Sequence, residues 1–230
     1  MRVLLKVVCA IGAILIAGSG VQAFEVGQSG IGFFGSAQVP MFNFGKWYST
    51  SPKFGMSYNY VVTPKIVAEV EYHYSKMGGG DLAERKFNWS VDSNDHLSPQ
   101  VSQKMAFNSL AASGLVHLRE LGSSGTKPYL TGGLGFFWYQ NKVSGLIFPG
   151  QTGTTLDTGL VLPAYNDDWP ALTMTVGVGA SIVTSARFLI DVRGRYNIIL
   201  GELRPLEDWG LLKTFPLQAL DIMVGFKYFW

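Results

Sequence analysis

The chain has 230 residues, a formal net charge of +2 and only 15% charged residues, below the roughly 25% of an ordinary soluble domain. A nucleic-acid-binding protein usually carries a dense basic stripe, so this balance argues against nucleic acid as a partner. The 28 glycines and the 13% of aromatic residues indicate instead a β-structure with many turns.

Residues 1–23 have the three parts of a cleaved secretory signal peptide. Two basic residues begin the segment, an apolar run follows, and small residues precede Ala23. We predict cleavage after Ala23, which leaves residues 24–230 as one barrel domain. The single cysteine, Cys9, lies in the removed part, so the mature chain is expected to contain neither a disulfide nor a thiolate metal site.

The mature chain shows repeated alternation of apolar and polar residues, and no run of 18 consecutive apolar residues. The clearest example is "ALTMTVGVGASIV" at residues 171–183. Period-2 alternation is the signature of a strand with two different faces. We therefore predict eight strands, at residues 30–39, 54–62, 65–75, 105–119, 129–139, 171–183, 187–197 and 219–230.

The connections between these strands alternate strictly between short and long. In an antiparallel meander, this order places every short turn at one rim and every long loop at the other. Outer-membrane barrels have this arrangement, with short periplasmic turns and long outer loops. Strands of about 11 residues, tilted near 45°, also cover roughly the 25 Å of an outer-membrane apolar band. The sequence predicts an all-β fold, an eight-stranded antiparallel up-and-down transmembrane β-barrel.

The two faces of the predicted strands differ in polarity. One face carries Leu, Ile, Val, Phe and Tyr, and the other carries charged residues together with Thr, Ser and Gly. A charge facing the midplane of a bilayer costs up to a few kcal/mol, so the charged face is predicted to line the interior. The predicted lumen charge network consists of Glu69, Glu71, Asp191, Arg193, Arg195, Asp221 and Lys227.

Two stretches resemble the small eight-stranded outer-membrane β-barrels of the OmpA/OmpX type. "KPYLTGGLGFFWY" at residues 127–139 is similar to the fifth-strand motif of that family, where small residues alternate with aromatic ones. "MVGFKYFW" at the end of the chain resembles the signal read by the barrel-assembly machinery, with Gly225, Tyr228 and Trp230 at the matching positions. The resemblance implies a protein of the Gram-negative-type cell outer membrane; it specifies fold and location far better than activity.

The lumen charges allow two interpretations. An eight-stranded barrel is filled by side chains, so opposite charges inside it are expected to neutralise each other in a structural network; the alternative is a small gated pore. Counting residues from the turn near Pro64 places Glu69 opposite Asn59. Counting through the last long loop places Arg193 near Asp221.

An enzymatic role is the second alternative. Outer-membrane enzymes that modify the acyl chains of lipid A need a His and a Ser near the outer leaflet, and no lipid-facing His is predicted. His73 and His117 face the interior by phase, with His117 placed opposite Thr131, and His96 lies in a polar loop. No metal site and no cofactor are implied. "GKWY" at residues 45–48 resembles the G-x-W of lipocalins, but a lipocalin would turn its charges outward.

The long loops are the part predicted to meet partners. Residues 76–104 are read as a polar, mobile loop, and residues 140–170 as two β-prone runs that extend two strands into an exposed hairpin. We expect contact with outer-membrane lipid and lipopolysaccharide, with the assembly machinery, and with an unknown extracellular ligand, in a non-enzymatic monomer. Interface aromatics are predicted as Tyr58, Tyr74, Trp138 and Tyr196 at the outer side, and Phe188, Phe226, Tyr228 and Trp230 at the periplasmic side.

Overall fold

The computed structural model describes residues 24–230 except 81, 83, 123, 207, 208 and 210. The predicted signal peptide and Cys9 therefore lie outside the described residues. Within the described part of the chain, no helix is long and apolar enough to cross a membrane.

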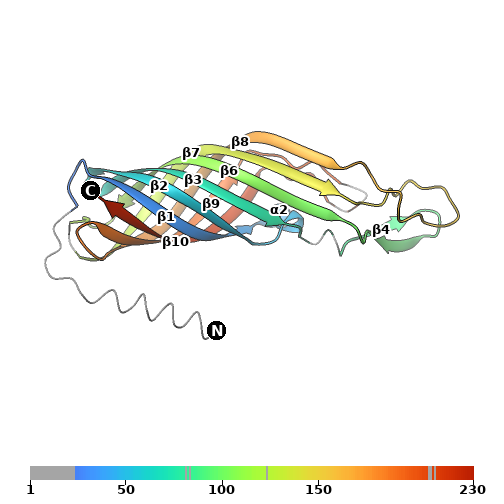
Figure 1. Ribbon diagram of the computed structural model, residues 1–230, viewed down its shortest axis with the longest axis horizontal. Helices are drawn as coiled ribbons and strands as arrows, with labels where there is room; N and C mark the ends of the chain where they lie inside the picture. Colours follow the sequence, from blue (N-terminus) through green and yellow to red (C-terminus); the bar gives the residue numbers. More distant parts are fainter. Residues whose placement is uncertain (1–23, 81, 83, 123, 207–208, 210) are drawn as a thin grey trace, which may run out of the picture.

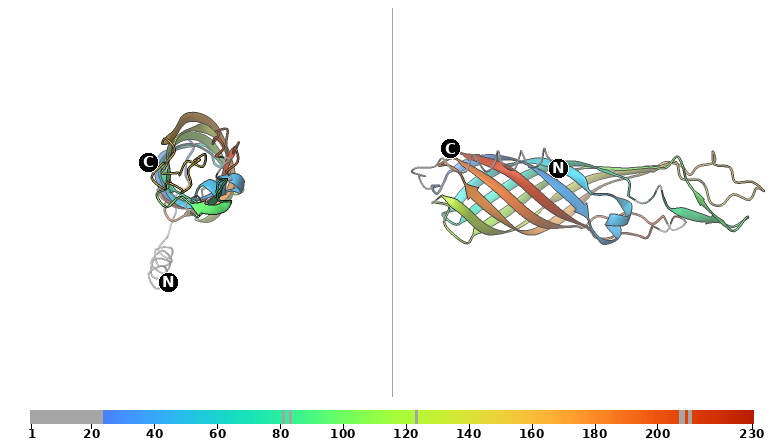
Figure 2. Two further views of the ribbon diagram at one scale, coloured as in Figure 1. Left: turned by 90° about the vertical axis from the view of Figure 1, so that its right-hand side faces the viewer. Right: turned by 90° about the horizontal axis from the view of Figure 1, so that it is seen from below.

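Eight long antiparallel strands form one closed barrel (Figures 1 and 2). They are β1 (Ser29–Pro40), β2 (Ser51–Thr63), β3 (Ile66–Gly78), β6 (Ser102–His117), β7 (Gly125–Ser144), β8 (Tyr165–Val183), β9 (Phe188–Ile199) and β10 (Leu217–Phe229). Their order around the barrel is β1-β10-β9-β8-β7-β6-β3-β2, so β1 closes against β10. The predicted eight-stranded up-and-down barrel is confirmed, and each predicted strand is present with its ends shifted by a few residues.

Three short connections lie at one end of the barrel and four long ones at the other, and we call these the short-turn end and the long-loop end. The strand β7 and its partner β8 continue past the others at the long-loop end (Figure 1). The ladder joins Val143 to Tyr165, and an isolated bridge joins Ile147 to Val161. The predicted extension of two strands into a hairpin is therefore confirmed, but Leu146 and Ile147 within it are buried rather than exposed.

Side chains alternate between the interior and the outer surface along each strand. In β3 every second residue is buried over the whole length of the strand. The exposed face carries a continuous apolar belt that includes Val70, Tyr72, Leu110, Leu134, Phe136, Leu172, Met174, Val176, Val178, Ile222, Val224 and Phe226. A surface of this size and composition is typical of a membrane-spanning barrel and is the reverse of a lipocalin, so the lipocalin alternative is wrong.

One interface aromatic lies at the other end from its predicted position. The Tyr58 hydroxyl is 2.7 Å from Ser29 Oγ, at the start of β1, so Tyr58 lies in the short-turn half of the wall. Counting along a strand gives its faces correctly, but depth depends on the stagger between strands, which the residue pattern of one strand does not contain.

Residues 76–104, predicted as a polar and mobile loop, contain ordered structure. The strands β4 (Lys86–Trp89) and β5 (Asn94–Leu97) form a separate hairpin beyond the barrel wall (Figure 1). Phe87 and Trp89 point to one side of β4 and are buried. A four-residue strand is too short to show a clear period in the sequence, which is why the hairpin was missed.

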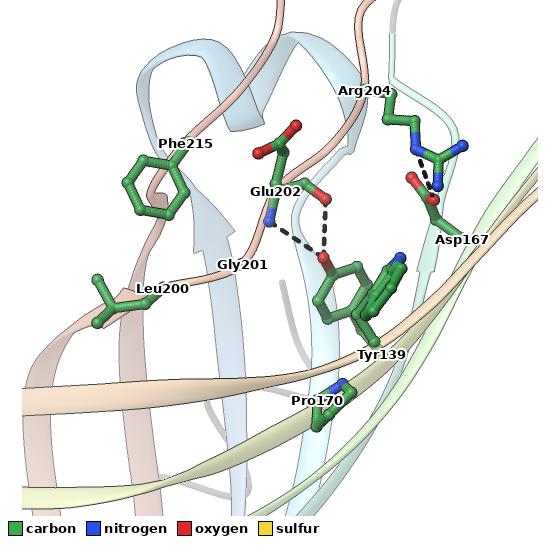
Figure 3. Close-up of a pocket in the computed structure, with 9 residues that line it drawn as sticks. Tyr139, Asp167, Pro170, Leu200, Gly201, Glu202, Arg204 and Phe215 are labelled. Carbon is green, nitrogen blue, oxygen red and sulfur yellow. Dashed lines mark hydrogen bonds and ion pairs between the residues drawn. The ribbon is translucent and has the colours of Figure 1, made fainter.

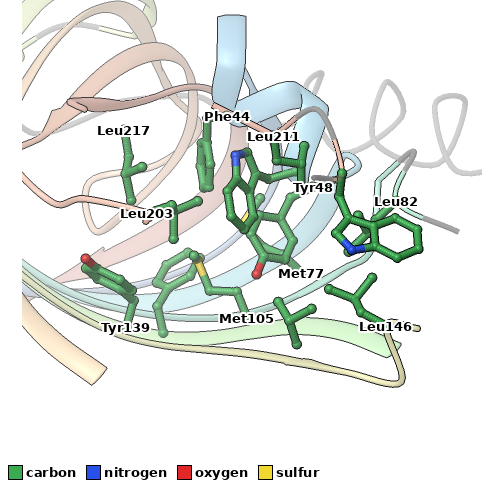
Figure 4. Packing of buried hydrophobic residues seen from close by; sticks show 14 of the residues in the cluster. Phe44, Tyr48, Met77, Leu82, Met105, Tyr139, Leu146, Leu203, Leu211 and Leu217 are labelled. Atoms are coloured by element: carbon green, nitrogen blue, oxygen red, sulfur yellow. The ribbon is translucent and has the colours of Figure 1, made fainter. Parts of the chain in front are cut away.

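A short helix, α2 (Phe42–Trp47), and the segment of residues 200–216 complete the long-loop end. We call the assembly of α2, the β4–β5 hairpin and residues 145–164 and 200–216 the outer cap. Its apolar side chains pack with those of the barrel interior at the long-loop end in one buried cluster (Figure 4). The cluster includes Phe44, Trp47, Tyr48, Met77, Phe87, Trp89, Met105, Phe107, Phe137, Tyr139, Leu203, Trp209 and Leu217.

Candidate functional site: the lumen and the outer cap

The middle of the lumen holds four carboxylates and four cations, all buried. The carboxylates are Glu69, Glu71, Asp191 and Asp221, and the cations are Lys53, Arg193, Arg195 and Lys227. Equal numbers of opposite charges make this layer formally neutral. A buried charge is tolerated only when it is paired and hydrogen-bonded, and each of these eight groups has an ionic partner.

Arg193, on β9, is the centre of the network. Its Nη1 lies 2.7 Å from Glu69 Oε1 and 3.1 Å from Glu71 Oε1, and its Nη2 lies 2.7 Å from Asp191 Oδ2. Its Nε donates to the Tyr129 hydroxyl at 2.8 Å, and that hydroxyl donates to Asp191 Oδ1 at 2.5 Å. All three guanidinium nitrogens of Arg193 are therefore used.

The remaining charges surround this centre. Arg195 pairs with Glu71 through Nη1, and its Nη2 lies 3.6 Å from Asp221 Oδ2. Lys227 pairs with Glu69 and lies 3.2 Å from Asp191 Oδ2, while Lys53 pairs with Asp221. The structure thus brings all seven residues named from the sequence into one network.

The cross-strand register between β9 and β10 differs from the one expected. Asp221 pairs with Arg195, and Arg193 pairs with Met223, so the predicted neighbour of Asp221 is wrong by two residues. The cause is the long connection 200–216, whose length does not fix the stagger of the strands it joins. By contrast, Glu69 pairs with Asn59 as predicted, because the intervening turn is short.

His73 and His117 lie inside the barrel, as the phases of their strands predicted, but one predicted cross-strand neighbour is wrong. His117 pairs with Tyr129, and it is Leu115 that faces Thr131. His73 Nε2 lies 3.3 Å from Glu71 Oε2, and His117 Nε2 lies 3.1 Å from Ser181 Oγ. Among the described residues, no group of three or more His, Cys, Asp or Glu could hold a metal ion.

Lys53 and Tyr129 are network members that were not named from the sequence. Lys53 shares the inward phase of Ser57 and Asn59 on β2, so its strand phase contained the signal. Tyr129 has the same phase as Thr131 on β7, which is also buried. A tyrosine suits the outer surface of a barrel as well as its interior, so residue type alone gave no reason to place it among charges.

The charged layer lies between two apolar layers. At the long-loop end it is covered by the cluster of the outer cap, in which the rings of Phe107 and Phe137 are 4.3 Å apart. At the short-turn end a second buried cluster contains Phe24 and Phe229, whose ring centroids are 5.0 Å apart, together with Val61, Val67, Leu115, Leu121, Tyr129, Val183 and Leu189. An ion entering from either end would have to cross an apolar layer before meeting the charges.

The outer cap is joined internally by specific contacts. Trp89 Nε1 donates to the Gln151 carbonyl oxygen at 3.0 Å, which links the β4–β5 hairpin to residues 145–164. The ring centroid of Phe87 lies 4.8 Å from that of Trp209, and this contact links the hairpin to residues 200–216. Next to the cap, Tyr48 donates to Asn141 Oδ1 on β7, and burial raises the pKa of the Tyr48 hydroxyl well above its usual value.

A pocket of about 330 Å³ opens at the rim between β8 and residues 200–216 (Figure 3). The Tyr139 hydroxyl donates to the Glu202 carbonyl oxygen at 2.7 Å and accepts from the Glu202 amide at 3.1 Å. Arg204 Nε lies 3.4 Å from Asp167 Oδ1 across the pocket. These groups can hold polar molecules, but no Ser, Thr or His is among the residues that line the pocket.

The segment identified as an assembly signal packs closely at one position. Phe34 points into the lumen between Gly225 on one neighbouring strand and Gly55 on the other. A Cβ on Gly225 would lie 2.7 Å from Phe34 Cβ and 2.7 Å from the Phe33 carbonyl oxygen. Tyr228 lies on the outer face, where its ring is 4.9 Å from Phe188, and Trp230 is exposed.

The fold is that of the small eight-stranded outer-membrane barrels, so the resemblance drawn from the sequence is confirmed at the level of architecture. Neisserial surface protein A (NspA) matches with a TM-score of 0.51 at 14% identity, over 87% of this chain and 96% of that one. A major outer membrane protein from Thermus thermophilus matches with a TM-score of 0.50 at 10% identity, over 88% and 99%. Ail, the attachment invasion locus protein of Yersinia pestis, reaches 0.48 at 15% identity, over 90% and 100%. No protein-family model and no curated protein sequence matches the chain.

Proposed function

We propose that the chain is an integral protein of a Gram-negative-type outer membrane, without enzymatic activity, that acts in membrane structure or in surface interaction through its outer cap. In this orientation the short-turn end faces the periplasm and the long-loop end faces the outside. The apolar belt around the wall supports residence in a bilayer, since an exposed surface of that extent would aggregate in water.

The observation that carries the proposal is the layered interior. A neutral set of paired charges lies between two buried apolar clusters, so the barrel interior has the character of a protein core. This arrangement weighs against the gated-pore alternative. The outer cap, which lies beyond the barrel wall, is then the part of the molecule that partners can reach.

The enzymatic alternative has little support in the described residues. An enzyme acting on lipid acyl chains needs its His and Ser at the lipid-facing outer rim. All three histidines of the chain are described: His73 and His117 lie inside the barrel, and His96 is in the β4–β5 hairpin, 2.9 Å from Asp92. The rim pocket of Figure 3 is lined by carboxylates and a guanidinium group, and neither Ser nor His is among the residues that line it.

The test of membrane residence is heat-modifiable mobility after refolding into lipid vesicles. We expect unheated protein to migrate as a compact folded band and boiled protein at its full mass. A compact monomer that folds in plain buffer without lipid or detergent would contradict the proposal.

Two further assays separate the alternatives. In a planar bilayer we expect no discrete conductance; conductance steps that change in E71A or R193A would favour the pore. After incubation with lipopolysaccharide, mass spectrometry is expected to show unchanged acyl chains, and lost or transferred chains would favour the enzyme.

A further inference from the structure

Three lysines face outward on three neighbouring strands close to the long-loop end. Lys76 is on β3, Lys104 on β6 and Lys142 on β7, and these strands lie side by side (Figure 1). Lys104 pairs directly with Lys142 across the ladder. Lys76 pairs with Ala106, so it is a diagonal neighbour of Lys104. Facing Cβ atoms in a sheet are about 5 Å apart and diagonal ones about 7–8 Å, so the three long side chains can reach a common point.

No carboxylate of the described chain forms an ion pair with any of these three lysines, whereas lysines elsewhere do have such partners. The exposed Lys213, for example, lies 3.0 Å from Glu202. Asp168 is the acid placed nearest by register: it pairs with Gln140 and is a diagonal neighbour of Lys142, but no ion pair joins the two side chains. Like charges directly opposite each other destabilise a sheet. Stability of the wall therefore does not explain this cluster.

The lysines surround a hollow of about 340 Å³ on the outer surface. Gly78 and Ala106, which alternate with the lysines on the ladder, carry no long side chain, and this keeps the hollow open. A Cβ added at Gly78 would meet nothing within 4 Å. Gln140 also lines the hollow.

The level of the hollow relative to the bilayer follows from the other residues on the same outward faces of β3 and β7. Tyr74 precedes Lys76 by two residues on β3, and Trp138 lies four residues before Lys142 on β7. Both aromatics are exposed, and each lies two residues beyond a belt residue, Tyr72 or Phe136, toward the long-loop end. Tyr and Trp in barrels mark the boundary between hydrocarbon and water. The lysines thus lie one step beyond the hydrocarbon, at the level of lipid head groups.

We propose that this hollow, which we call the lysine site, binds the phosphate groups of a phosphorylated glycolipid in the outer leaflet. The inference rests on the proposed function, because it requires the long-loop end to face the outside. Ammonium groups bind phosphate as point charges, and three of them without internal partners supply the compensation that a phosphorylated head group needs. The lipid supplies in turn the counter-charge that the wall lacks.

The experiment measures lipid binding to the protein in phosphatidylcholine nanodiscs, with bisphosphorylated lipid A, dephosphorylated lipid A and inorganic phosphate as the three probes. The variant K76Q/K104Q/K142Q is compared with K65Q, which changes an exposed lysine at the short-turn end. We expect the triple variant to bind bisphosphorylated lipid A about 100-fold more weakly, and K65Q to bind it like the wild type. The wild-type affinity is expected to fall as the salt concentration rises.

Equal affinity of the triple variant and the wild type would overturn the inference. So would binding of dephosphorylated lipid A at the same strength, or displacement of the lipid by inorganic phosphate at equal concentration, which would indicate a free-anion site. If the triple variant does not fold, the single variant K142Q serves instead, with an expected loss of about fivefold. Heat-modifiable mobility is recorded for every sample: wild-type protein that does not fold in lipid counts against the proposed function, while folded variants with unchanged binding count against the lysine site alone.

Discussion

Arg193 and Glu69 are joined across the full width of the lumen, with Nη1 of one 2.7 Å from Oε1 of the other. Arg193 is on β9 and Glu69 on β3, which are four strands apart in either direction around the eight-stranded wall. No backbone ladder connects these strands. This ion pair, with those of Glu71 and Lys227, therefore links opposite sides of the barrel directly.

We predict that R193A destabilises the barrel by about 3–5 kcal/mol, because removal of one partner leaves buried carboxylates without compensation. Urea unfolding in lipid vesicles measures the change. The control is K213A, which removes an exposed pair with Glu202 and is expected to cost less than about 1 kcal/mol. Equal midpoints for R193A and the wild type would show that the cross-lumen pairs add no stability.

Two variants of the C-terminal segment separate its packing in the folded barrel from its recognition by the assembly machinery. G225A is predicted to destabilise the folded barrel by about 1–3 kcal/mol, since the added Cβ would lie 2.7 Å from backbone and side-chain atoms of β1. G194A is the matched control, because a Cβ there meets nothing within 4 Å. Unfolding of the refolded proteins in vesicles is the measurement, and a G194A effect as large as that of G225A would refute the packing argument.

W230A is predicted to act differently. The Trp230 side chain is exposed and is part of the segment that resembles the assembly signal. We therefore expect near-normal unfolding of the variant in vitro but a lower amount of inserted protein in cells. Quantitative blotting of outer-membrane fractions tests this expectation. Normal insertion of W230A together with a large loss of stability would reverse the two roles.

The outer cap is predicted to depend on Trp89. W89A removes a buried ring and the hydrogen bond to the Gln151 carbonyl oxygen, a change of about 3–5 kcal/mol for a packed aromatic. We expect faster cleavage of the cap by added protease on intact vesicles, with an unchanged barrel fragment. V91A, at an exposed position of the same hairpin, is the control and should be cleaved like the wild type.

The turn of the β4–β5 hairpin is predicted to loosen in acid. The backbone amide of Asn94 donates to Asp92 Oδ1 at 2.9 Å, and this bond lowers the pKa of the Asp92 carboxyl. A carboxyl whose pKa is depressed by folding stabilises the folded form above its unfolded pKa of about 3.9, and the effect is lost as the pH falls through the lower folded value. Exchange of the Asn94 amide should therefore accelerate below about pH 4, beyond the intrinsic trend. In D92N the exchange of the Asn94 amide should show no such acceleration. An acceleration that persists in D92N would show that another group causes it.

Much of the fold could be predicted because a barrel wall imposes a local rule. Residues such as Glu69 and Val70 must face opposite sides wherever their strand pairs, so the two faces, the strand count and the sorting of short and long connections follow from residue order alone. Glu69 was also placed opposite Asn59, because a short turn leaves little freedom in register. The inward set of charges was therefore available from the sequence.

Only the tertiary structure decided how those charges meet. Arg193 contacts Glu69 through the stagger and closure of the whole barrel, which no single strand encodes, and Asp221 takes Arg195 because a long loop does not fix register. Trp89 and the outer cap pack through contacts between segments far apart in the chain. The lysine site exists because the pairing of β6 with β7 puts Lys104 beside Lys142, which lie 38 residues apart in the sequence. Periodicity is a local property that the sequence carries, whereas distances across a lumen or around a wall depend on how all eight strands close.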